Sequence, residues 1–294
     1  MIQTNAAASV FGEHIPPAAV GVSFALLTLA VTLGSAKRVS DVTVRLIPAL
    51  AAVYIALCVW IVAANIASLP DVFSRVVGEA FSLRPALGAA GGVTVARAIR
   101  YGVTRGILSN EAGSGTSPTA HAAAETDDPH RQGVFGIFEV FADTVVLCTL
   151  TAAVILLAPD GGEDGVRLAV YAFGELAGAW AGTFIRVSVV LFAFATVICQ
   201  AYYGEVALGY FTRSERARRA YIAVYSALCV VGSVIDPGRM WLAADLVISL
   251  MTALNVAALL WAFANRRMRI ELLPYAYTRR RGTPRPPARK RGGL

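Results

Sequence analysis

Residues 109–118 of this chain read Ser-Asn-Glu-Ala-Gly-Ser-Gly-Thr-Ser-Pro, and they form its most polar cluster. The run combines glycines and hydroxyls with one carboxylate, Glu111. The segments on either side are apolar enough to cross a bilayer. Polar residues within or beside membrane segments usually mark substrate or ion pathways. The stretch therefore predicts a membrane transport protein.

The composition of the whole chain agrees with a membrane protein. Of its 294 residues 56% are hydrophobic and 15% charged, and the mean hydropathy is +0.61. Soluble domains are about 45–50% apolar and about 25% charged. The departure predicts an all-α protein that crosses the membrane several times. Its cysteines stand singly in apolar runs, which predicts buried thiols rather than disulfides or a metal site.

The basic character of the chain comes from one end. After Asn265 there are ten Lys or Arg and one acid, Glu271, so the rest of the chain is slightly negative. A basic tail directly after an apolar segment is typical of a cytoplasmic topology anchor rather than of a nucleic-acid-binding face. We expect a membrane domain over residues 1–264 and a disordered cytoplasmic tail over residues 265–294.

A membrane-spanning helix needs about 20 mainly apolar residues. Seven candidate spans follow, at residues 17–34, 46–69, 88–108, 134–158, 183–211, 220–235 and 241–264. Two amphipathic stretches, residues 72–84 and 168–180, are not expected to cross.

The third candidate is poor by hydropathy, but the distribution of charge requires it to cross. Cytoplasmic loops carry an excess of Lys and Arg. The basic tail, the Arg-rich loop at residues 213–219 and the loop at residues 37–45 all belong inside, and the acidic loop at residues 160–164 belongs outside. One crossing is therefore needed between Pro70 and Gln132, and residues 88–108 are the segment that can supply it.

This third span contains Gly91, Gly92 and Gly102 as well as arginines. Irregular backbone at membrane depth is tolerated where it lines a cavity, and discontinuous helices hold the substrate in many transporters. We expect a helix broken at these glycines, which would let the backbone approach a substrate. The alternative is an interfacial helix whose arginines reach the headgroups.

Several polar residues lie inside other predicted spans. Glu139 and Asp143 are four residues apart on one helical face, where they could couple an ion or pair with a nearby arginine. Thr196 could offer a hydroxyl to Na⁺ or could bond back to its own helix. His121 and His130 lack further ligands at metal-binding spacing. An intramembrane enzyme using His121 stays a remote alternative, and we expect no enzymatic activity.

Residues 105–118 resemble the signature of the sodium:alanine (alanine or glycine:cation) symporter family. The similarity continues in order through residues 120–124, 132–133, 140–144, 148–152, 192–196, 202–205 and 251–255. It covers nearly the whole chain before the tail.

The resemblance implies a LeuT-like inverted-repeat fold and co-transport of alanine or glycine with Na⁺ or H⁺ by alternating access. Na⁺ would be the coupling ion, and no other cofactor is expected. Family members have about eleven spans, and the seven here correspond to the last seven. The first repeat is expected to be largely missing, so the fold would be incomplete. The chain would then be a non-transporting fragment or would work with a separate N-terminal half.

The resemblance also assigns roles to residues. Gln3, Asn5 and the three glycines would face the substrate, and Thr196 would bind Na⁺, although Ala195 departs from the usual Ser or Thr. Packing or gating of the inner vestibule is expected of Ser109, Asn110, Glu111, Gly113, Gly115 and Asp143. The expected location is the plasma membrane, with a lipid bilayer, Na⁺ and a small neutral amino acid as partners.

Overall fold

The computed structural model describes residues 1–265 apart from Glu13, residues 34–35, residues 81–88, Ala112, Glu125 and Asp127. Within these ranges the chain is helical and contains no strand, as predicted. All but one residue of the predicted tail lies outside the described part. In chain order the elements are α1 (Ile2–Ser9), α2 (Pro17–Thr32), α3 (Ala36–Ala64), η1 (Ile66–Ser68), α4 (Leu69–Ala80), α5 (Ala89–Asn110), α6 (Thr116–His121), α7 (Pro129–Val140), η3 (Phe141–Leu147), α8 (Cys148–Leu157), α9 (Gly165–Ala177), α10 (Ala179–Phe211), α11 (Glu215–Val234) and α12 (Pro237–Ala264).

Each of the seven predicted spans contains a helix, namely α2, α3, α5, the run from α7 to α8, α10, α11 and α12. Four segments are long and apolar enough to cross a membrane: Ile47–Ala64, Arg131–Leu157, Ala179–Phe211 and Pro237–Ala264. Helix α2 is apolar but shorter. The amphipathic stretches form α4 and α9. These features fit a helical membrane protein.

Helix α5 passes without interruption through Gly91, Gly92 and Gly102, so the predicted break at these glycines is wrong. A glycine costs a helix about 1 kcal/mol relative to alanine, but it keeps its backbone hydrogen bonds. The interruption comes later, after Asn110. There the chain leaves the helical path and resumes it only in the short helix α6.

The fourth predicted span contains an irregularity that hydropathy does not reveal. Between α7 and α8, residues Phe141–Leu147 form a π-helix, η3. π-Helical turns are rare and occur mainly as short insertions in α-helices, often at functional sites. Asp143 and Thr144 lie within it.

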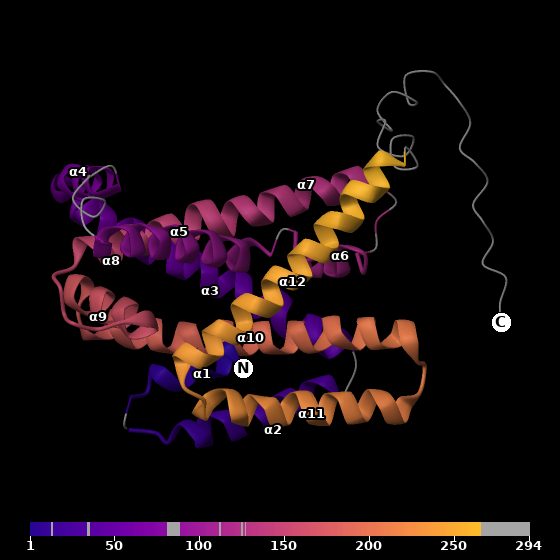
Figure 1. Ribbon diagram of the computed structural model, residues 1–294. Coiled ribbons are helices and arrows are strands. Elements are labelled where there is room, and N and C mark those ends of the chain that lie inside the picture. The colour runs from indigo at the N-terminus through magenta and orange to yellow at the C-terminus, as the bar shows by residue number, and fades with distance from the viewer. Residues whose placement is uncertain are drawn as a thin grey trace.

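The helices pack around two apolar clusters. One centres on α3, α9 and α10, with Cys58, Phe173 and Ile185 almost fully buried. The other joins α1, α2, α10 and α11. Helices α2 and α11 lie side by side (Figure 1), and their contact is close. A Cβ atom at Gly21 would lie 2.8 Å from the backbone Cα of Val230.

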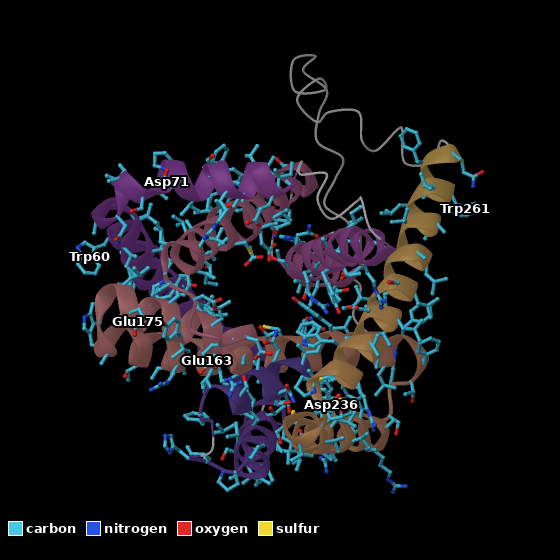
Figure 2. All side chains as sticks on the ribbon, turned by 60° about the vertical axis from the view of Figure 1, so that its left-hand side comes forward. Trp60, Asp71, Glu163, Glu175, Asp236 and Trp261 are labelled. Carbon is cyan, nitrogen blue, oxygen red and sulfur yellow. The ribbon has the colours of Figure 1, made fainter. Side chains whose placement is uncertain are left out.

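Apolar side chains also cover the outside of the bundle. Trp60 on α3 and Trp261 on α12 project away from the other helices (Figure 2) and are 53% and 70% exposed. Helix α12 crosses the bundle obliquely (Figure 1), and most of its apolar side chains are exposed. Such faces suit contact with lipid or with further protein.

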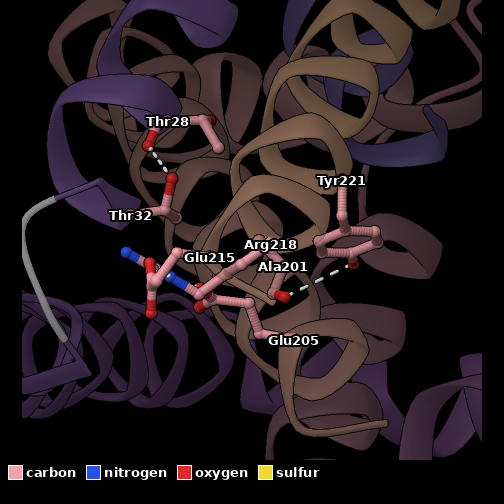
Figure 3. A network of polar contacts seen from close by, with 7 residues as sticks. All are labelled: Thr28, Thr32, Ala201, Glu205, Glu215, Arg218 and Tyr221. Atoms are coloured by element: carbon pink, nitrogen blue, oxygen red, sulfur yellow. Dashed lines mark hydrogen bonds and ion pairs between the residues drawn. The ribbon is translucent and has the colours of Figure 1, made fainter. Parts of the chain in front are cut away.

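The turn between α10 and α11 is held by polar contacts (Figure 3). The Arg218 guanidinium pairs with Glu205 on α10 and, at 3.1 Å, with Glu215 on its own helix. These two carboxylates raise the pKa of Arg218 above its usual value. The Tyr221 hydroxyl donates to the carbonyl of Ala201 at 3.4 Å. The contacts fix α11 antiparallel to α10.

Candidate functional site

The break between α5 and α6 has an unusual backbone. Glu111 has φ of 50°, Gly113 of 90° and Gly115 of 88°. Glycine adopts such left-handed angles freely, but a side chain makes them costly. Glu111 is the sole non-glycine residue with positive φ in the described chain. Strained residues of this kind cluster at ligand-binding sites.

The break lies deep between long apolar helices. Its polar partners are Gln200 on α10 and Asn255 on α12, and Asp143 on η3 binds the end of α5. At 1.5 Å per residue, these partners lie roughly 14–21 Å from the ends of their segments that we expect to be cytoplasmic. The contacts favour a position within the thickness of the apolar helices over the inner vestibule that the resemblance implied for these residues.

The Glu111 carboxylate is the centre of the polar contacts in the break. Its Oε1 accepts a hydrogen bond from Gln200 Nε2 at 2.9 Å, and its Oε2 accepts one from Thr116 Oγ1 at 2.7 Å. Ser114 Oγ donates to the backbone carbonyl of Glu111 at 2.6 Å and lies 2.8 Å from Thr116 Oγ1. The side chain therefore ties α6 and α10 to the break.

Asn255 holds the break from the side of α12. Its Nδ2 donates to the carbonyl of Gly113 at 2.9 Å. A Cβ atom at Gly115 would lie 3.3 Å from Asn255 Oδ1, and one at Gly113 would lie 3.5 Å from Thr252 Cγ2. Both glycines thus permit the positive φ angles of the break and leave room for the side chains of α12.

Ser109, in the last turn of α5, is joined to the π-helix. Its hydroxyl donates to Asp143 Oδ2 at 2.8 Å and lies 3.5 Å from the Sγ of Cys148. The widened turn of η3 thus presents a carboxylate to the helix that leads into the break. The polar residues around the break therefore include Asp143, for which the resemblance implied gating or packing.

His121 joins α6 to α7. Gln132 Nε2 donates to its Nδ1 at 2.7 Å, so its Nε2 holds the proton and donates to Glu139 Oε2 at 3.0 Å. A neutral histidine satisfies both contacts. The network therefore positions α6 against α7.

Helices α5 and α12 are also joined nearer the N-terminal end of α12. Arg105 NH1 lies 2.7 Å from Asp245 Oδ1, and its guanidinium stacks 3.7 Å from the ring centroid of Trp241. Arg100 lies 3.9 Å from the same carboxylate. The Arg105–Asp245 and Gly113–Asn255 contacts follow the same order along both segments. The chain therefore passes from α5 into the break in the same direction as α12.

The other predicted site residues lie elsewhere. Thr196 Oγ1 donates to the Phe192 carbonyl at 3.0 Å within α10. It is four residues from Gln200, so it occupies the same face of α10 one turn away. Asn5 Nδ2 donates to the carbonyls of Gly232 and Ile235, both at 3.0 Å, and so caps α11.

Gln3 is half-buried on α1, and Gly102 is exposed on α5. Gly91 and Gly92 lie near the start of α5, remote in sequence from the break. The structure thus groups Ser109, Glu111, Gly113, Gly115 and Asp143 around the break, with Thr196 one turn along α10. It does not bring Gln3, Asn5 or the three helical glycines to them.

Gln200 and Asn255 were not among the predicted site residues. Each is an uncharged polar residue inside an otherwise apolar segment, which is the signal that could have marked them. No group of three or more His, Cys, Asp or Glu side chains that could hold a metal ion occurs in the described ranges. A hard monovalent cation would instead need the hydroxyl, carbonyl and carboxylate oxygens of the break.

A separate cavity of about 760 Å³ lies between the α1–α2 connection, α9 and the start of α10. Its polar lining includes His14, Arg167, Glu175 and Arg186. None of the predicted site residues lines it.

Comparison with known proteins identifies the same family that residues 105–118 resemble. The model of the sodium:alanine symporter family matches residues 1–285. The chain is 34% identical over 261 residues to the amino-acid carrier protein AlsT of Bacillus subtilis, covering 87% of this chain and 55% of that protein.

Two further relatives have names that describe their transport. The sodium/alanine symporter AgcS of Methanococcus maripaludis is 34% identical over 268 residues, which are 88% of this chain and 58% of AgcS. The probable sodium/glutamine symporter GlnT of Bacillus subtilis is 34% identical over 232 residues, which are 78% of this chain and 48% of GlnT. The chain therefore spans about half the length of these relatives.

Proposed function

Because the chain belongs to the sodium:alanine symporter family, we propose that it acts in the Na⁺-coupled symport of a small neutral amino acid across the cell membrane. The family is one of transporters, and the names of AlsT and AgcS describe amino-acid carriage and sodium/alanine symport. The observation that best supports this function is the break at Glu111–Gly115, which brings polar backbone and side chains between long apolar helices.

The mechanism we propose is alternating access in a LeuT-like inverted-repeat fold. Helices α5 and α6 would be the two halves of one discontinuous helix, as secondary transporters use at their binding sites. The strained backbone of the break would move as the inner side opens, while the Arg105–Asp245 pair holds α5 against α12. The basic tail would lie in the cytoplasm.

Thr196 is our candidate ligand for Na⁺. Its hydroxyl proton is used by the Phe192 carbonyl, which leaves its oxygen lone pairs able to accept or to coordinate. It lies on the face of α10 that also presents Gln200 to Glu111. A cation there would sit one helical turn from the break.

Uptake into proteoliposomes tests this function. With an inward Na⁺ gradient, uptake of labelled alanine should be at least fivefold faster than with choline in place of Na⁺. Collapsing the gradient should remove the difference. Equal rates in Na⁺ and choline, for alanine, glycine and glutamine alike, would contradict Na⁺-coupled symport.

A further inference from the structure

We propose that the Glu111 carboxylate binds a monovalent cationic group during transport, either free Na⁺ or the α-ammonium group of the amino acid. The proposal rests on the proposed function and names the residue that would recognise the positive charge of the transported species. A site built on a carboxylate would repel the substrate's own carboxylate, so the break would receive the cationic partner.

The charge of Glu111 supports the proposal. Glu111 forms no ion pair with a Lys, Arg or His among the described residues, whereas Asp245 and Glu205 each pair with an arginine. Its two hydrogen-bond donors, Gln200 and Thr116, are both neutral. An ionised carboxylate between apolar helices is stabilised by an opposite charge. A cation that passes during transport would supply one.

The Glu111 carboxylate also has free capacity to accept hydrogen bonds. A carboxylate offers about four acceptor positions, and the two donors fill one on each oxygen. Thr116 Oγ1 lies beside it, and Ser114 Oγ lies 2.8 Å from Thr116 Oγ1, so the site has neutral oxygens as well. Oxygen atoms of this kind suit a hard cation, and they equally accept hydrogen bonds from an ammonium group.

Hydroxyls without partners adjoin this region. The Oγ1 atoms of Thr252 and Thr144 are buried and have no hydrogen-bond partner in the described structure. Thr252 touches the break at Gly113, and Thr144 follows Asp143 on the π-helix. Buried polar atoms are almost always satisfied, so these two hydroxyls have free capacity for a further polar group, as do Thr28 Oγ1 and Ser226 Oγ elsewhere in the bundle.

The backbone of Glu111 gives independent support. A left-handed residue is most easily a glycine or an asparagine, and a glutamate there is strained. Two other residues of the break with positive φ, Gly113 and Gly115, are glycines, but Glu111 is not. The side chain of Glu111 therefore has a role that glycine cannot fill.

Binding to the purified full chain tests the proposal, with Glu111→Gln as the principal variant. If free Na⁺ is the ligand, the variant should bind ²²Na⁺ at least tenfold more weakly in the absence of amino acid. If the α-ammonium group is the ligand, Na⁺ binding should be unchanged, and the affinity for labelled alanine at saturating Na⁺ should fall at least tenfold.

Two further variants keep the result interpretable. Glu111→Gly removes the carboxylate and relieves the left-handed strain, so it should fold even where Glu111→Gln does not, and it should show the same loss. Glu215→Gln, which removes an exposed carboxylate in the α10–α11 turn, should bind like the wild type.

The proposal is overturned if both affinities stay within twofold of wild type in the two Glu111 variants. It is also overturned if the wild-type chain binds neither Na⁺ nor alanine. Failure of the proposed function is recognised separately. In that case alanine uptake is absent, while Na⁺ binding that depends on Glu111 persists.

Discussion

At the scale of single residues, the geometry of the break depends on a few backbone angles. The sequence marks residues 109–118 as polar, but it does not say which glycine is needed for its angle. Gly91, Gly92 and Gly102 look like helix breakers and lie in an intact helix, while Gly113 and Gly115 have positive φ. Glycine content alone could not separate them, because a helix tolerates glycine at a modest cost.

Gly115→Ala should destabilise the protein by about 1–2 kcal/mol, because alanine is strained at a φ of 88° and its Cβ would lie 3.3 Å from Asn255 Oδ1. Thermal unfolding in detergent measures this. Gly102→Ala is the matched control, since it is exposed in α5 with nothing within 4 Å, and it should be neutral or slightly stabilising. Equal melting temperatures for the two variants would contradict the account of the break.

At the scale of elements, hydropathy and the distribution of charge were enough to predict where the long helices lie, and four of the described segments are long and apolar enough to cross a membrane. Seven apolar stretches were expected and each contains a helix, including α5, which charge alone required. The π-helix at Phe141–Leu147 was not predictable, because its residues read as ordinary apolar helix. The partners of the break were also missed, since Gln200 and Asn255 lie far from it in the sequence.

The pairing of α5 with α12 gives a prediction at this scale. Asp245→Asn should lower stability by about 1.5–3 kcal/mol, because it removes the charged acceptor of Arg105 at a carboxylate that is only 9% exposed. Thermal unfolding again provides the measurement. Asp164→Asn removes a carboxylate that is 94% exposed and should change stability by no more than about 0.5 kcal/mol. A similar loss in both variants would mean that the α5–α12 pair has no special role.

At the scale of the whole molecule, the chain corresponds to about half the length of relatives such as AlsT and AgcS. Its polar break is nevertheless bonded by Gln200 on α10 and Asn255 on α12. Asp143 on η3 bonds Ser109 at the end of α5 that leads into the break. The large apolar surfaces of α3 and α12 fit a membrane environment. We propose that this break binds the transported species between the apolar helices.

The accessibility of Ser114→Cys tests that claim most directly, in a background in which the native cysteines are replaced by alanine. Ser114 is half-buried in the break, and Arg213→Cys in the exposed α10–α11 turn serves as the control. Modification by a membrane-impermeant thiol reagent should slow at least fivefold at position 114 when Na⁺ and alanine are added together, and should not change at position 213. Equal modification rates at position 114 with and without these ligands would contradict the assignment of the break as the binding site.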